Sequence, residues 1–206
     1  MTPFAPSRRA LMAGAAACAL AGRGARAQDA LEEQGYAIGD MSLGAEDAPV
    51  RIVEYSSFTC PHCASFHNNT WPEIEARYVD TGKARITFRE VYFDQFGLWA
   101  SMLARCGGEG AFFGFTKTLF ERQQGWARAD DPVAELRRIG RLGGLPEERI
   151  RQCLTDEAFL THLVERYQET ASEDGVRSTP TFFINGDRFT GDMSVERFSE
   201  LIEERL

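Results

Sequence analysis

The pattern of apolar positions predicts a strand, a helix and a second strand near the start of the folded chain. Residues 50–58 form an apolar, β-branched run, which is typical of a strand. Residues 64–79 favour a helix, with a kink or break at Trp71-Pro72 because proline lacks the N–H that a helix interior uses. Beyond a turn at Thr81-Gly82, residues 84–93 predict the second strand. This order requires a parallel strand pair joined by a right-handed crossover.

Residues 95–175 show helical periodicity instead. Apolar side chains recur there at helical spacing, and we interpret the phenylalanines among them as core residues. Asp131-Pro132 supplies an N-cap followed by a proline in the first helical position. Five helical segments are predicted, at 98–106, 111–123, 132–142, 146–154 and 156–175.

Strand signals return after Gly175. Residues 181–184 and 188–190 flank Asn185-Gly186, and Asn-Gly between two apolar runs is a strong hairpin signal. Ser194 then caps a final amphipathic helix that reaches residue 202.

The element order predicts an α/β fold of the form β-α-β, helical block, β-β-α. Residues 49–94 and 176–206 would form the α/β domain, and residues 95–175 an all-helical insertion within it. Residues 28–48 are polar and contain three glycines, so they are expected to form an N-terminal arm.

The motif with the clearest chemistry is Cys60-Pro61-His62-Cys63, between the first predicted strand and its helix. A C-x-x-C pair in this position is typical of thiol redox sites. Backbone N–H groups at a helix N-terminus favour a thiolate, so Cys60 is expected to be the reactive cysteine. Pro61 suits the first helical position, and His62 can lower the pKa of the thiol by hydrogen bonding or positive charge. A disulfide whose reduced form is stabilised in this way is a strong oxidant.

Two other interpretations of the cysteine pair compete with redox chemistry. A C-x-x-C pair is also half of a structural zinc site, and His67 could supply a third ligand. A buried, inert pair is the other alternative. Redox chemistry is favoured because no second C-x-x-C lies nearby and because a strand precedes the motif and a helix follows it.

The first 27 residues have the pattern of an export signal. Ser7-Arg8-Arg9 is a twin-arginine pattern, and residues 10–21 are alanine-rich and weakly apolar. Ala25-Arg26-Ala27 offers small residues for cleavage before Gln28. An uncleaved anchor is disfavoured because the apolar region is too short to span a bilayer. A lipoprotein signal ending at Cys18 is disfavoured because residues 15–17 are all alanine. Export by a cleavable, Tat-type signal is therefore predicted.

Export changes the cysteine count. Removal of Cys18 with the signal would leave four of the five cysteines, and an even number in an oxidising compartment favours disulfides. If Cys60 and Cys63 pair, Cys106 and Cys153 are left for each other. Two buried free thiols are the alternative, since free cysteine is among the most buried residue types.

The charge balance argues against nucleic acid as a partner. The chain has 23 basic and 31 acidic residues, and residues 1–27 carry four arginines and no acid. The remainder therefore has 19 basic and 31 acidic residues, a net charge of −12. The length and composition are those of an ordinary globular domain.

The chain resembles the DsbA-type thiol:disulfide oxidoreductases from about Val50 onward. The resemblance rests on Phe58-Thr59-Cys60-Pro61-His62-Cys63 and on residues 175–183, Gly-Val-Arg-Ser-Thr-Pro-Thr-Phe-Phe. Cys-Pro-His-Cys is typical of the DsbA branch, whereas thioredoxins usually carry Gly-Pro between their cysteines. The resemblance implies a thioredoxin fold with an inserted helical domain. No cofactor and no metal are expected.

The resemblance also implies roles for residues outside the motif. Pro180 would be cis and face the active site, so that Thr179 could pair with an extended substrate strand. An ordinary trans proline at a strand start is the alternative. Glu54 matches a buried acid to which a proton relay is ascribed, and a solvated strand acid is the alternative. The contexts of Cys106 and Cys153 resemble a subgroup with a second disulfide in the helical domain.

The implied function is donation of the Cys60–Cys63 disulfide to unfolded or partly folded exported proteins in the periplasm. A DsbB-like, quinone-linked membrane protein would reoxidise the pair. A disulfide isomerase or reductase is the nearest alternative, although residues 28–48 are too few for an added dimerisation module. A thiol-independent holdase is a further alternative, and it would still hold unfolded chains when Cys60 is replaced.

Overall fold

The computed structural model describes residues 28–206. The predicted export signal, including Cys18, lies outside these residues. Within them, none of the helices has the length and apolar character needed to cross a bilayer.

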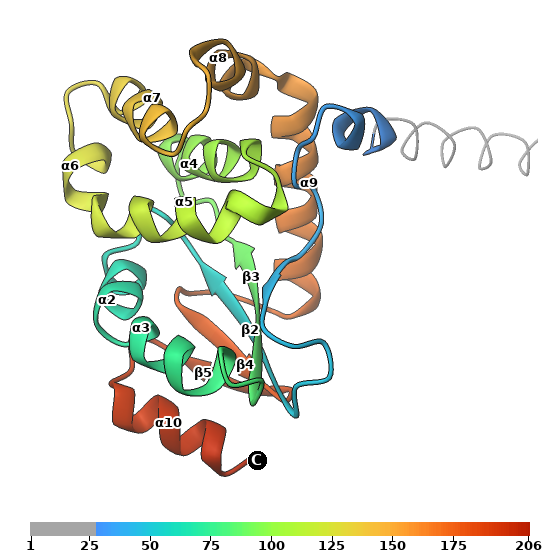
Figure 1. The fold of residues 1–206 in the computed structure, drawn as a ribbon, viewed down its shortest axis with the longest axis vertical. Helices are drawn as coiled ribbons and strands as arrows, with labels where there is room; N and C mark the ends of the chain where they lie inside the picture. The colour runs from blue at the N-terminus through green and yellow to red at the C-terminus, as the bar shows by residue number, and fades with distance from the viewer. Residues whose placement is uncertain (1–27) are drawn as a thin grey trace, which may run out of the picture.

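A five-stranded mixed sheet has the order β1-β3-β2-β4-β5. Strands β2 to β5 are labelled in Figure 1. The strands are β1 (Met41–Leu43), β2 (Val50–Ser56), β3 (Ala84–Glu90), β4 (Thr181–Ile184) and β5 (Asp187–Thr190). β2 pairs with β3 in parallel, as the β-α-β order required, and the other three pairs are antiparallel. β4 and β5 form the predicted hairpin, with positive φ at Asn185 and Gly186 as a type I′ turn requires.

The crossover from β2 to β3 is helical and broken, as predicted. α2 (Pro61–Asn69) ends before α3 (Trp71–Ile74), and a π-helical segment η1 (Glu75–Val79) completes the connection. The break falls at Thr70, because Pro72 has no N–H to continue the helical ladder. Together with α10 (Val195–Glu203), this crossover buries an apolar cluster against one face of the sheet. Ser194 caps α10 as expected.

Six helices follow β3 and lead back to β4. They are α4 (Gln95–Cys106), α5 (Glu109–Glu121), α6 (Gln123–Ala127), α7 (Pro132–Leu142), α8 (Glu147–Thr155) and α9 (Glu157–Glu173). α4 to α8 gather beyond the end of the sheet, and α9 runs back along it (Figure 1). Asp131 caps α7, as its sequence predicted. On the face of the sheet opposite α2, Tyr55 of β2 packs with Ala171 of α9.

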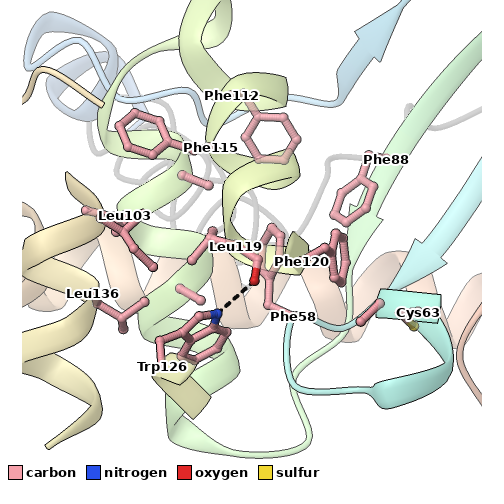
Figure 2. Packing of buried hydrophobic residues seen from close by; sticks show 14 of the residues in the cluster. Phe58, Cys63, Phe88, Leu103, Phe112, Phe115, Leu119, Phe120, Trp126 and Leu136 are labelled. Carbon is pink, nitrogen blue, oxygen red and sulfur yellow. Dashed lines mark hydrogen bonds between the residues drawn. The ribbon is translucent and has the colours of Figure 1, made fainter. Parts of the chain in front are cut away.

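One apolar core joins these helices to the redox-motif region. It contains Phe58, Cys63 and Phe88 as well as Leu119 and Trp126 of α5 and α6 (Figure 2). Burial of so many aromatic side chains is a large favourable contribution to folding. One of the cores of the helical block is therefore shared with the segment that carries Cys60 and Cys63, and a second cluster, around Cys106 and Cys153, is formed without that segment.

Three elements differ from the expectation for their segments. The predicted arm contains β1, and residues 28–33 are helical. β1 is only three residues long and so shows too little alternation to be identified, but Met41 is buried and pairs with Phe88. α6 is a five-residue helix beyond the end of α5 and is too short for a helical stripe.

The structure joins Cys106, at the end of α4, to Cys153 in α8, in agreement with the prediction from the cysteine count. Both residues are buried and 47 positions apart. The bridge therefore ties two insertion helices together at a site out of contact with solvent.

Replacing both cysteines by serine should lower the free energy of unfolding by roughly 2–4 kcal/mol, because a closed loop of this length restricts the unfolded chain. Urea denaturation of the oxidised double variant and of the unmodified protein measures the difference. Equal midpoints with equal slopes would show that the bridge adds no stability.

Candidate active site

The C-terminal end of β2 delivers the cysteine motif to the start of α2. The Cys60 N–H donates to the Ser57 carbonyl at 3.1 Å, which closes a turn after the strand. Cys60 is the N-cap of α2 and Pro61 is the first helical residue, as the sequence predicted. Cys60 is 9% exposed, whereas Cys63 is completely buried one turn further along α2. The two thiols are therefore adjacent but lie in different surroundings.

These surroundings separate the acidities of the two thiols. The pKa of Cys60 is lowered to about 5, chiefly by a hydrogen bond from the Cys63 side chain. The neighbouring Thr179 side chain and backbone N–H groups of the first turn lower it too, against the opposing effect of burial. Cys60 is thus a thiolate at neutral pH when the pair is reduced.

Cys63 behaves in the opposite way. Burial raises the pKa of its thiol well above the ordinary value, and the neighbouring Cys60 raises it further. The neighbouring Ser56 side chain and the Ser57 N–H lower this pKa and only partly offset the effect of burial. The reduced pair therefore holds one proton, on Cys63, and one negative charge, on Cys60.

The segment before β4 completes the surroundings of Cys60. The Thr179-Pro180 peptide bond is cis, and the Thr179 carbonyl oxygen lies 3.5 Å from the Cys60 sulfur. Pro180 is buried and Thr179 is partly exposed. The structure thus brings together the two segments that the sequence singled out, although about 120 residues separate them.

His62 contributes through its backbone rather than through its imidazole. Its side chain is exposed on α2, and no hydrogen bond joins the imidazole to any other described residue. The His62 N–H, by contrast, helps to lower the pKa of Cys60. Pro61 is also exposed beside Cys60.

Glu54 is completely buried on β2, which excludes the alternative of a solvated strand acid. One carboxylate oxygen lies 2.9 Å from Nε2 of His67, and the other has no hydrogen-bond partner among the described residues. His67 follows Cys63 by four residues on α2, so both side chains face β2. His67, which the sequence offered as a zinc ligand, is instead the partner of Glu54. Within residues 28–206, no cluster of three or more His, Cys, Asp or Glu is arranged to hold a metal.

The loop between β2 and α2 is held by side chains that the sequence did not mark as functional. The Thr59 hydroxyl donates to Asp94 at 2.7 Å, and Asp94 also caps α4 by accepting from Gly97. Gln123 of α6 donates to two carbonyl groups of the loop. Such contacts depend on where the insertion packs against the loop, so no local spacing in the sequence predicts them.

Comparison with known proteins gives the same assignment as the geometry. Residues 37–204 match the thioredoxin family model. A putative protein-disulfide oxidoreductase of Rickettsia felis is 36% identical over 168 residues, which are 81% of this chain and 60% of that protein. Disulfide bond formation protein D of Bacillus subtilis is 28% identical over 192 residues, 86% of this chain and 82% of that protein. The chain thus spans about three fifths of the length of the Rickettsia relatives.

Solved structures agree with this placement. The crystal structure of Wolbachia pipientis alpha-DsbA1 superposes with a TM-score of 0.75 at 31% identity, over 81% of this chain and 90% of that chain. Oxidised BdbD of Bacillus subtilis shares the fold, with a TM-score of 0.73 at 22% identity over 83% of this chain and 95% of that chain. The chain belongs to the thioredoxin family, and within that family it is a DsbA-type protein.

Proposed function

We propose that this chain is a protein-disulfide oxidoreductase that donates the Cys60–Cys63 disulfide to exported proteins during their oxidative folding. The observation that carries the proposal is the unequal acidity of the two thiols. A thiolate at Cys60 stabilises the reduced pair, and a stabilised reduced form makes the disulfide a strong oxidant. The low pKa also makes Cys60 a good leaving group.

The reaction follows from the exposure of the two sulfurs. A substrate thiolate attacks the Cys60 sulfur, a mixed disulfide forms, and the Cys60–Cys63 bond breaks to release Cys63 as a thiolate. Cys63 takes up a proton because its buried site disfavours charge. A second thiolate of the substrate attacks the substrate sulfur of the mixed disulfide and releases Cys60 as a thiolate. Two electrons pass from the substrate to the cysteine pair.

Thr179 and Pro180 are proposed to position the substrate. The Thr179 carbonyl faces the Cys60 sulfur, directly before β4, and Thr179 is partly exposed. An extended segment of the substrate can pair with this backbone and present its cysteine to Cys60. Pro61 and His62 border the same sulfur on the α2 side.

Glu54 is proposed to exchange a proton with Cys63. Its partner His67 lies one helical turn from Cys63 on α2, and both α2 side chains face β2. Its carboxylate oxygen without a partner is free to accept or release a proton, while His67 holds the other oxygen. This supplies the proton that the buried Cys63 thiolate requires.

The location and the partners are part of the same proposal. The acidic composition suits a soluble periplasmic protein, and the twin-arginine pattern favours export by a cleavable Tat-type signal. The substrates would be unfolded or partly folded exported proteins with free cysteines. A DsbB-like, quinone-linked membrane protein would reoxidise the pair. Residues 49–94 and 176–206 would carry the redox site, with residues 95–175 as the helical insertion.

The reduction potential of the Cys60–Cys63 pair should be more oxidising than roughly −180 mV, because the reduced form is stabilised. Equilibration of the protein from residue 28 onward with glutathione buffers measures it. A potential near −270 mV, the thioredoxin range, would identify a reductase or a partner-driven isomerase instead. A Cys60→Ala variant that still prevents aggregation of unfolded proteins would indicate a holdase.

Titration of the reduced protein, followed by thiolate absorbance, should show a midpoint at a pH of about 5 that is absent in Cys60→Ala. Because the pKa is lowered on folding, the ionised thiol stabilises the reduced fold at high pH, and this stabilisation is lost as the pH falls through 5. Cys63→Ala should raise the midpoint by about one unit or more, since the bond from Cys63 has the largest effect. A midpoint near 8.5 in the unmodified protein would contradict the assignment.

Glu54→Gln should slow oxidation of a peptide with two cysteines by on the order of tenfold or more, because the amide cannot transfer the proton. The titration midpoint of Cys60 is the internal control and should stay unchanged, because the proposed proton exchange is between Glu54 and Cys63. Unchanged oxidation rates at every pH would assign Glu54 a structural role only.

A further inference from the structure

Gln123 connects the helical insertion to the backbone around Cys60. It is the first residue of α6 and is 4% exposed. Its Nε2 donates to the carbonyl oxygens of Phe58 and Cys60, each at 2.9 Å. One amide group of the insertion therefore holds the loop on both sides of Thr59.

The two carbonyl groups have different surroundings. The Cys60 carbonyl oxygen already accepts the first helical hydrogen bond of α2, from the Ala64 N–H at 3.1 Å. The Gln123 amide donates to the second lone pair of the same oxygen. Among residues 28–206, no group other than Gln123 donates to the Phe58 carbonyl. Loss of the amide would leave that oxygen without a partner at a buried position, where it is costly.

Gln123 is itself held firmly in place. The indole N–H of Trp126 donates to the Leu119 carbonyl at 2.8 Å, which fixes α6 against the end of α5 (Figure 2). Phe120 packs on Phe58 with ring centroids 5.1 Å apart. These contacts hold the Gln123 amide in one position. Its two hydrogen bonds therefore limit the movement of the loop.

We propose that Gln123 is a positioning residue of the redox site, which fixes the Cys60 backbone so that its sulfur lies at the N-terminus of α2 and against Thr179. The proposal rests on the role of Cys60 as the reactive cysteine. The thiolate at Cys60 is stabilised by hydrogen-bond donors that must all be directed at its sulfur, including first-turn N–H groups of α2. A loop that is free to rotate at Phe58 and Cys60 aligns the sulfur with these donors only part of the time.

The helical insertion thus takes part in setting the chemistry of the cysteine pair. Thr59, between the two held carbonyl groups, is bonded separately to Asp94 at the start of α4. The backbone is therefore fixed from α6 and the adjoining side chain from α4. A purely structural role for Gln123 would change the stability of the fold without changing the properties of the thiol.

The test compares Gln123→Met, which keeps an unbranched side chain without a donor, with Gln124→Met, which changes the exposed neighbouring glutamine. Gln123→Met should raise the titration midpoint of Cys60 by about one unit and lower the equilibrium constant for oxidation of glutathione by up to about tenfold. Melting temperatures are measured for the oxidised and reduced forms of each variant. The reduced form of Gln123→Met should lose more stability than the oxidised form. Gln124→Met should match the unmodified protein in all three measurements.

The proposal is overturned if Gln123→Met melts earlier by the same amount in both redox states and keeps the midpoint and the equilibrium constant. If Gln123→Met does not fold, Gln123→Asn replaces it, since the shorter amide cannot reach both carbonyl groups, and an unchanged midpoint there is equally decisive. A failure of the proposed function appears separately, as a midpoint near 8.5 in the unmodified protein.

Discussion

The hydrogen bonding of β2 on both of its edges is the constraint on which the rest of the site depends. β3 pairs with one edge in parallel and β4 with the other in the antiparallel direction. Tyr55 of β2 lies opposite Thr181 of β4, so the chain after one strand and the chain before the other emerge at the same end of the sheet. That register brings Cys60 and Thr179 together. A slip by one residue would turn every side chain of the strand to the other face.

The second consequence of this register is chemical. Glu54 and Ser56 lie on one face of β2, two residues apart, and each faces a side chain of α2 one helical turn apart. Glu54 has one carboxylate oxygen bonded to His67, whereas its other oxygen and the Ser56 hydroxyl have no hydrogen-bond partner among the described residues. Tyr55 points to the opposite face, where its hydroxyl donates to Asp174 at 2.6 Å and lies 3.0 Å from the Thr170 carbonyl oxygen of α9. The strand thus separates a redox face from a face that anchors α9.

Much of this arrangement could be predicted from the sequence because its signals are local. The cysteine motif follows a β-branched run and begins a helix, and the Asn185-Gly186 turn and the caps at Asp131 and Ser194 are short patterns with a known geometry. The His67–Glu54 pair and the bonds of Gln123 could not be predicted in the same way. They join residues that are 13, 63 and 65 positions apart, and they form only after the sheet register and the path of the insertion are set. β1 and α6 are too short to show any periodicity.

The bridge between Cys106 and Cys153 differs in its surroundings from the cysteine pair of the motif, which is present as two free thiols. Exchange requires that an incoming thiolate reach a sulfur along the axis of the bond. The bridge lies within an apolar cluster that also contains Tyr36 and Phe159, and its two residues are no more than 2% exposed. Cys60, at 9% exposure, presents the more accessible sulfur of its pair, since Cys63 is completely buried. Under the proposed function, burial would protect the Cys106–Cys153 cross-link while Cys60 exchanges, so that a single redox environment would serve both.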